Sequence, residues 1–328
     1  MKRFIITISL SIVIPLILLA GIYIWTDPFR CVHPFDINDV DATNREYLST
    51  ELFLRNYPTY HYNSFIFASS RGGGLNTYQW KQYLPEGAQP FLFQAWAETL
   101  TGIEMKIEYL SKQNIPINNA LVLLDIPSSF AYEQLPTAAL TKKHFIFTGQ
   151  SRFAYNMDQF TNFIQKPSLW MACVNSKLHG VCIPFTSDTI TNDYIQTNYL
   201  HYSELPEQDS LKQCSEKTRR NVLKAYEEKH LQVTPPLITE QFAHQLRNIR
   251  NIFERHQTNY QIVLSPAYCY LYPAVSPDDK ALLELIFGDD RVHDYTGYNE
   301  FTNDYNNFSD PNHFGLRVGY LLLEDIYK

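Results

Sequence analysis

The chain has 328 residues, of which 45% are apolar and 15% aromatic, enough to bury one large core. Only 19% of the residues are charged and the net charge at pH 7 is -7, which argues against global disorder. No basic patch is interleaved with aromatic residues, so we expect no nucleic-acid partner. The five cysteines follow no metal-ligand spacing, so we expect no metal site; their pairing stays open.

The first predicted element is an apolar N-terminal helix. Lys2 and Arg3 precede a run from Phe4 to Trp25 that contains no charged residue. At about 1.5 Å per residue, this run is long enough to cross a hydrocarbon core of roughly 30 Å. We therefore predict a signal anchor over residues 1–26, with the bulk of the chain outside the cytoplasm. A long cleaved signal peptide is the alternative, and it would place the chain in the same compartment.

Strands and helices then alternate. After a lead-in over residues 27–60 with a short helix, three apolar runs bounded by polar residues predict buried strands, and helical patterns lie between them. The predicted strands cover 64–69, 90–96 and 119–127, and the predicted helices cover 47–55, 76–84 and 98–114.

Residues 128–215 lack this rhythm and are rich in Asn, Thr, Ser and aromatic residues, so we interpret them as an inserted cap. Regular elements return afterwards, with helices predicted at 215–231, 239–257, 276–288 and 313–328 and strands at 260–266 and 291–297. The alternation predicts an α/β three-layer sandwich with a mainly parallel, flavodoxin-like sheet, in one domain over residues 61–328.

The stretch "FIFASSRGGG" (65–74) places two serines at the carboxyl end of the first predicted strand. Parallel sheets bind ligands at this edge, and a serine there can present its hydroxyl as a nucleophile. An ordinary strand-to-helix turn capped by Ser69 is the alternative. We expect the three glycines to reduce crowding over Ser70, and Arg71 to be a structural partner of a nearby carboxylate or carbonyl.

A serine nucleophile needs a base, and the base needs an orienting acid. Asp310-Pro-Asn-His313 lies just before the last predicted helix, where the aspartate can hold Nδ1 of the imidazole while Nε2 faces the serine. A second Asp-x-x-His, formed by Asp290 and His293, reaches into a predicted strand. Alternation along a strand would direct those two side chains to opposite faces, so we do not expect them to act together.

This order of motifs resembles the SGNH (GDSL-like) hydrolase superfamily, with Ala68-Ser69-Ser70 standing where the family has Gly-Asp-Ser. The anchored topology and the strand ends "FASSR" and "VLSP" resemble the membrane-anchored branch that includes the D-alanine transfer protein of teichoic acid synthesis and the alginate acetylation proteins. The resemblance covers about residues 60–127 and 258–328. It implies a catalytic set of Ser70, His313 and Asp310 that needs no cofactor.

The same resemblance implies a single-pass protein of the bacterial cytoplasmic membrane. Its expected activity is that of a serine esterase or O-acyltransferase on acyl esters of a cell-surface glycan, with an acylated glycan or acyl donor as substrate and a membrane-bound acyltransferase as an expected partner. The sequence does not separate hydrolysis from transfer.

The chain departs from the family at the oxyanion donors. No glycine follows the second strand until Gly102, and no asparagine follows the third strand. We expect the backbone N–H groups of Ser70 and Trp96 and the hydroxyl of Ser128 or Ser129 to take these places, and Asp125 to bind a sugar hydroxyl. Because loss of one oxyanion donor slows catalysis by roughly 100- to 1,000-fold, a non-catalytic binding or assembly partner is the alternative function.

Overall fold

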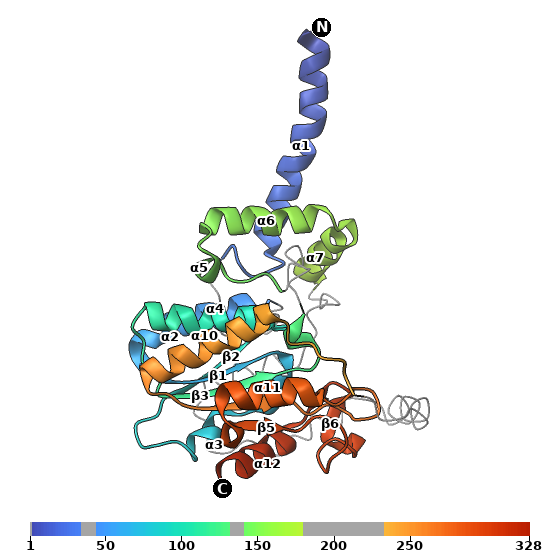
Figure 1. Cartoon of the computed structure of the whole chain (residues 1–328). Coiled ribbons are helices and arrows are strands. Elements are labelled where there is room, and N and C mark those ends of the chain that lie inside the picture. The colour runs from blue at the N-terminus through green and yellow to red at the C-terminus, as the bar shows by residue number, and fades with distance from the viewer. Residues whose placement is uncertain (1, 34–43, 132–140, 180–232) are drawn as a thin grey trace. The chain divides into compact units, whose positions relative to one another are not determined.

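The computed structural model describes residues 2–33, 44–131, 141–179 and 233–328 (Figure 1). They belong to two compact units. One unit comprises residues 1–51 and 135–192, and the other comprises residues 52–134 and 193–328. The helix predicted at 215–231 lies outside the described residues, as does most of the region predicted as an insertion.

The second unit is built on a parallel sheet of five strands in the order β2-β1-β3-β4-β5. The strands are β1 (Ser64–Ala68), β2 (Pro90–Gln94), β3 (Asn119–Leu124), β4 (Asn259–Leu264) and β5 (Val292–Asp294). Every residue of β1 and β3 is buried, because helices cover both faces of the sheet. The prediction of an α/β fold with a mainly parallel sheet is confirmed.

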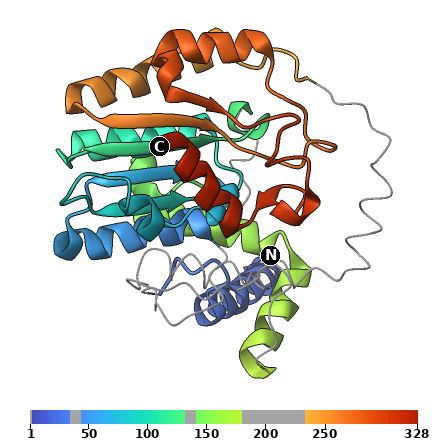
Figure 2. The ribbon, with the colours of Figure 1, turned by 90° about the horizontal axis from the view of Figure 1, so that it is seen from below.

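Helices form the two outer layers (Figures 1 and 2). The part of α2 (Arg45–Tyr60) from Leu52 onward, α4 (Leu100–Lys112) and α10 (Glu240–His256) lie on one face, and α3 (Thr77–Lys81) and α12 (Leu316–Tyr327) lie on the other. Helix α11 (Pro277–Phe287) packs beside β5. Thr239 and Ser276 are the N-caps of α10 and α11, each accepting a hydrogen bond from a backbone N–H in the first turn.

A cluster of phenylalanines joins α2 to the sheet. Phe65 and Phe67 alternate along β1 and therefore share a face, and the parallel register sets them beside Phe91 and Phe93 of β2. The ring of Phe53 in α2 lies 5.0 Å from that of Phe93, measured between centroids. These side chains are nearly or fully buried, so this cluster is a large part of the apolar core on that face.

Two short elements complete the carboxyl edge of the sheet. A 3-10 helix, η1 (Ser70–Gly74), follows β1, and a small antiparallel hairpin of β6 (Phe308–Asp310) and β7 (His313–Phe314) precedes α12. The sequence predicted no strand here and a helix from residue 313, whereas β7 occupies His313–Phe314 and α12 begins at Leu316. The hairpin strands pair because Phe308 and Phe314, opposite each other in the register, are both buried in the core.

The glycines after Ser70 have a different role from the one we expected. Gly72 and Gly74 are buried, and a Cβ at Gly72 would overlap the Cβ of Ala68. A Cβ at Gly74 would overlap the ring of Phe314 and lie 2.7 Å from its carbonyl oxygen. These two glycines therefore allow η1 to pack directly on β1 and β7, and the expectation that they open space for substrate above Ser70 was wrong.

The first unit contains the N-terminal helix α1 (Lys2–Thr26) together with α5 (Phe145–Thr148), α6 (Arg152–Ile164) and α7 (Pro167–His179). Its core includes Tyr23 of α1, Tyr155 and Phe163 of α6 and Cys173 of α7. In the described part of the chain, no helix is both long enough and apolar enough to cross a membrane. Cys31, Cys173 and Cys269 are buried free thiols.

We predict that Gly319→Ala destabilises the second unit. Helix propensity alone would make this change favourable by about 1 kcal/mol, but a Cβ at Gly319 would overlap the carbonyl oxygen of Gly74. Backbone cannot yield as a flexible side chain can, so we expect a net loss of about 1–3 kcal/mol in the free energy of unfolding. Urea unfolding of the two proteins measures this loss.

Gly315→Ala is the matched control, because the nearest atom to its added Cβ would lie at an ordinary 3.8 Å. Its effect should be limited to the weak preference against alanine at an N-cap, at most about 1 kcal/mol. Equal losses for both variants would contradict the close packing of η1 against α12.

Candidate active site

The candidate site lies where the direction of the sheet connections reverses. In the strand order, β1 stands between β2 and β3, so the chain passes from β1 to β2 on one side and then crosses back to β3 on the other. Parallel α/β sheets bind ligands at this switch point, outside the carboxyl ends of the strands. Ser69 and Ser70 directly follow β1, and Asp125 directly follows β3.

The two neighbouring serines have separate roles. Ser69 is the N-cap of η1, and its Oγ accepts a hydrogen bond of 3.1 Å from the backbone N–H of Arg71. The same hydroxyl donates to Oδ2 of Asp125, and Ser69 is buried. Ser70 begins η1 and is only partly buried. Both interpretations of the serine pair therefore apply. Ser69 is the cap of the turn, and Ser70 is the residue whose hydroxyl is presented at the sheet edge.

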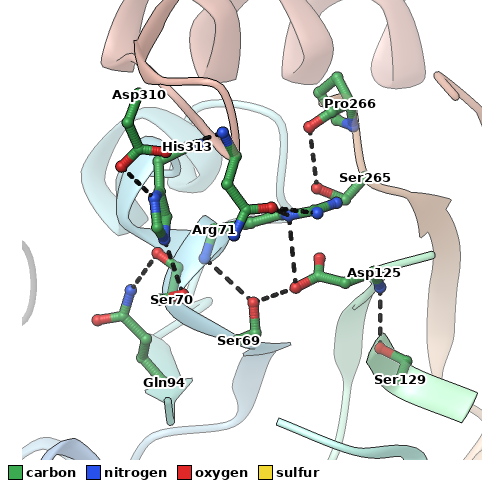
Figure 3. Close-up of polar contacts among 11 residues, drawn as sticks. Ser69, Ser70, Arg71, Gln94, Asp125, Ser129, Ser265, Pro266, Asp310 and His313 are labelled. Atoms are coloured by element: carbon green, nitrogen blue, oxygen red, sulfur yellow. Dashed lines mark hydrogen bonds and ion pairs between the residues drawn. The ribbon is translucent and has the colours of Figure 1, made fainter. Parts of the chain in front are cut away.

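Ser70, His313 and Asp310 form a continuous hydrogen-bonded set (Figure 3). The Oγ of Ser70 lies 2.8 Å from Nε2 of His313, and Nδ1 of His313 lies 2.7 Å from Oδ2 of Asp310. Asp310 ends β6 and His313 begins β7, so the two-residue turn of the hairpin holds the carboxylate against the imidazole. The geometry is that of a nucleophile, a base and an orienting acid.

The electrostatics of Asp310 suit the orienting role. Burial is the largest influence and raises the pKa of its carboxyl, but interactions with His313 and two backbone N–H donors outweigh it and lower the pKa below the ordinary value. These backbone donors belong to Asn312 and His313, at 2.8 and 3.2 Å from Oδ1. The ionised Asp310 carboxyl therefore stabilises the folded state at pH values above its ordinary pKa. This contribution to the free energy of unfolding is lost as the pH falls through the lowered pKa.

Arg71 connects the nucleophile loop to the hairpin. Its Nε donates to Oδ1 of Asn312 at 2.9 Å, and Asn312 is the turn residue directly before His313. The same Nε lies 3.7 Å from Oδ2 of Asp125, and the guanidinium stands over the ring of Tyr272 at 5.1 Å from its centroid. The Arg71 side chain is 2% exposed. It is a structural partner of a carboxylate and a carbonyl-type oxygen, as the sequence suggested.

Asp125 does not fit its expected role. The Oδ2 atom accepts the Ser69 hydroxyl and faces Arg71, and the residue is almost fully buried. Its backbone N–H donates to Oγ of Ser129 at 2.8 Å, which fixes the turn after β3. Asp125 therefore holds η1 in place, and the expectation that it offers a carboxylate to a sugar was wrong.

The predicted oxyanion donors lie at different places. Ser70 and Trp96 each follow the paired residues Ala68 and Gln94 by two positions, so they stand at corresponding points after β1 and β2. Trp96 is partly buried, whereas Ser128 is exposed at the start of η2 (Ser128–Phe130). Within the described structure, no hydrogen bond links Ser128 to Ser70, His313 or Asp310.

Sequence reasoning missed Gln94 and Asn312. Gln94 ends β2, is fully buried, and donates from Nε2 to the backbone carbonyl oxygen of Ser70 at 3.0 Å. Its Oε1 is buried and has no hydrogen-bond partner among the described residues. A polar residue at the end of an otherwise apolar strand was the available signal for Gln94. Asn312 had no such signal, because its role depends on the hairpin turn.

The second Asp-x-x-His is not part of the site. His293 lies in β5 and its Nε2 is 2.9 Å from Oε1 of Gln261 in β4, while Asp290 belongs to the preceding 3-10 turn. Among the described residues, no group of His, Cys, Asp and Glu is arranged to hold a metal ion. One shallow cavity, of about 240 Å³, lies at the amino ends of the strands beside Asn63 and Asn118, at the opposite edge of the sheet.

No protein-family model matches this chain, and no curated protein matches it significantly in sequence.

We predict that Arg71→Lys slows the reaction of Ser70 with a fluorophosphonate by about 10- to 100-fold, because the hairpin that carries His313 is no longer held in register. Lysine keeps the charge beside Asp125 but cannot reproduce the planar guanidinium between Asp125 and Asn312. The measurement is the labelling rate per folded molecule, with folding checked by thermal unfolding.

Two further variants test whether Arg71→Lys acts by displacing His313 or by destabilising the whole protein. Arg291→Lys removes another arginine–aromatic contact, with Tyr260, and should leave labelling unchanged. Asn312→Ala should slow labelling as Arg71→Lys does, and the double variant should add little, because both remove one interaction. A fully additive double variant would exclude the proposed link.

Proposed function

We propose that this protein is a serine-dependent acyl-transfer enzyme, an esterase or an O-acyltransferase, in which Ser70 is the nucleophile. The observation that carries the proposal is the pair of hydrogen bonds from Ser70 Oγ to His313 Nε2 and from His313 Nδ1 to Asp310 Oδ2, at 2.8 and 2.7 Å. Neither distance needs adjustment for proton transfer. The site stands at the sheet edge where α/β proteins bind ligands.

The reaction follows from these contacts. Ser70 Oγ attacks the acyl carbonyl carbon while Nε2 of His313 takes the hydroxyl proton. Asp310 keeps the Nδ1–H bound and stabilises the imidazolium. Collapse of the tetrahedral intermediate breaks the ester bond, and the leaving oxygen receives the proton from Nε2, which gives an acyl ester on Ser70. Water or a sugar hydroxyl then attacks this ester, transfers its proton to Nε2, and Ser70 Oγ recovers it.

We assign the protein to the SGNH-like superfamily on the order of its motifs and propose an acyl ester of a cell-surface glycan as substrate. The five-stranded parallel sheet and the place of Ser70 after its first strand support this assignment. Water as acceptor gives an esterase, and a sugar hydroxyl gives a transferase working with a membrane-bound acyltransferase. No cofactor enters the proposed chemistry.

We further propose that α1 anchors the chain in the bacterial cytoplasmic membrane, with the other elements on the outer side. The run from Phe4 to Trp25 has no charged residue, and several of its apolar side chains are at least half exposed. Examples are Ile12, Ile17 and Leu18, at 56%, 64% and 62% exposure. A helix with apolar side chains around its circumference is stable in lipid and unfavourable in water.

A non-catalytic binding or assembly partner of an acylation system is the second candidate. The observation that favours it is the incomplete set of oxyanion donors, since Ser128 is exposed and the amide of Gln94 is directed at the Ser70 carbonyl oxygen. An intact triad without an oxyanion hole would bind an ester and turn it over poorly.

Fluorophosphonate labelling of the full chain in detergent tests the proposal. We expect covalent modification of Ser70, located by peptide mass mapping. The modification should be absent in Ser70→Ala and slowed by about 1,000-fold or more in His313→Ala, because the hydroxyl loses its base. If the folded protein is not labelled at Ser70, the proposal of an enzyme is wrong and the proposal of a binding or assembly partner remains.

We predict that Asp310→Asn slows the labelling of Ser70 by roughly 10,000-fold, because an amide favours the wrong imidazole tautomer. Asp290→Asn is the matched control from the second Asp-x-x-His and should label at the wild-type rate. If the two variants label equally fast, Asp310 is not the orienting acid.

A further inference from the structure

Helix α6 has an apolar face that the second unit's chemistry does not use. Phe153, Met157, Phe160 and Ile164 are spaced by four, three and four residues and therefore form one stripe along the helix. Phe153 is 75% exposed and Met157 is 44% exposed, while the two later residues are partly buried. Tyr155 and Asn162 are buried on the opposite side of the helix.

The stripe is continuous with the apolar surface of α1. Figure 1 shows α6 lying crosswise at the end of α1. The ring of Phe160 lies 5.4 Å from that of Tyr23 in the last turns of α1, and Phe160 and Ile164 both pack against the core that contains Tyr23. The stripe therefore begins beside the end of α1, at Phe160 and Ile164, and continues along α6 to the exposed Phe153.

Helix α7 adds a second apolar face. It packs against both α1 and α6. Met171 is 69% exposed and Leu178 is 61% exposed, and the partly buried Val174 lies on the same side of the helix. Trp170 instead packs against the core, and its Nε1 donates to the carbonyl oxygen of Phe163 at 2.7 Å. Exposed apolar side chains that share one face of a helix are typical of helices that lie at a membrane–water interface.

The charge of this segment is opposite to that of the chain. Residues 141–179 contain five Lys and Arg residues and a single acidic residue, Asp158, although the whole chain has a net charge of -7. Arg152, Lys166 and Lys177 are exposed beside the apolar faces. Basic residues that flank an apolar face favour a surface of anionic lipid, each by about 1 kcal/mol near the headgroups.

We propose that α6 and α7 form an interfacial platform that lies in the headgroup region of the outer leaflet, with Phe153 and Met171 inserted into the lipid. The inference rests on the proposed anchoring of α1 and goes beyond it, because it places a second, non-spanning part of the chain in the bilayer. The occupant of the apolar faces is the membrane that α1 enters, since stripe and anchor are continuous.

Site-directed spin labelling of the full chain in vesicles of phosphatidylcholine and phosphatidylglycerol tests the platform. Nitroxides are attached to Phe153→Cys and Met171→Cys, and the unsubstituted chain gives the background from native thiols. Oxygen concentrates in lipid and a nickel chelate stays in water. We expect the ratio of oxygen to nickel relaxation to be several-fold higher at both sites than at Leu285→Cys in α11, which is 79% exposed in the second unit.

A label at Leu18→Cys in α1 separates the two proposals. A lipid-type ratio at Leu18 with a water-type ratio at Phe153 and Met171 would overturn the platform and leave the anchor. Water-type ratios at all three sites would overturn both. Labels at Phe153 and Met171 shielded from both reagents would indicate a protein occupant and would also overturn the platform. Ser70 labelling is measured separately, so failure of the chemistry is recognised independently.

Discussion

The site depends on the close backbone approach of η1 to its neighbours. Ser70 and His313 are 243 residues apart in the chain, and their hydrogen bond exists only because η1 packs directly against β7 and α12. Gly72, Gly74 and Gly319 provide this approach, since a methyl group at any of them would overlap another part of the protein. Close-packed backbone of this kind cannot relax by side-chain rotation, so it holds Ser70 and His313 at a defined separation.

A buried polar network supports the same junction. Asp125 receives the Ser69 hydroxyl and faces Arg71, and Arg71 in turn binds the turn residue Asn312. Because Arg71 and Asp125 are 2% and 5% exposed, loss of one partner would leave a buried charge, at a cost of about 3–5 kcal/mol. The network therefore stabilises the fold and orients His313 at once, while Ser70 and Asp310 remain more accessible to solvent.

The two units differ in the surfaces that they expose. In the second unit, buried strands and capped helices build a rigid edge on which a serine, a histidine and an aspartate meet. In the first unit, apolar side chains remain exposed along α1, α6 and α7, and residues 141–179 contain five Lys and Arg residues but a single acidic residue, although the chain as a whole is acidic. A surface with this composition is unfavourable in water and suited to an anionic bilayer. It therefore agrees with the proposed anchor and platform, and with the proposed site of action at the cell surface.

The sequence alone determined the fold class, because uninterrupted apolar runs such as 119–124 suit only strands covered on both faces. It also singled out Ser70, Asp310 and His313, since nucleophile, base and acid must be of these residue types. The tertiary structure brings the predicted Asp310 and His313 to Ser70. It alone decided that Ser69 caps while Ser70 is presented, and that Gln94 and Asn312 belong to the site. It also reversed the roles expected of Asp125 and the glycines. These features depend on contacts between residues distant in sequence, which local patterns do not encode.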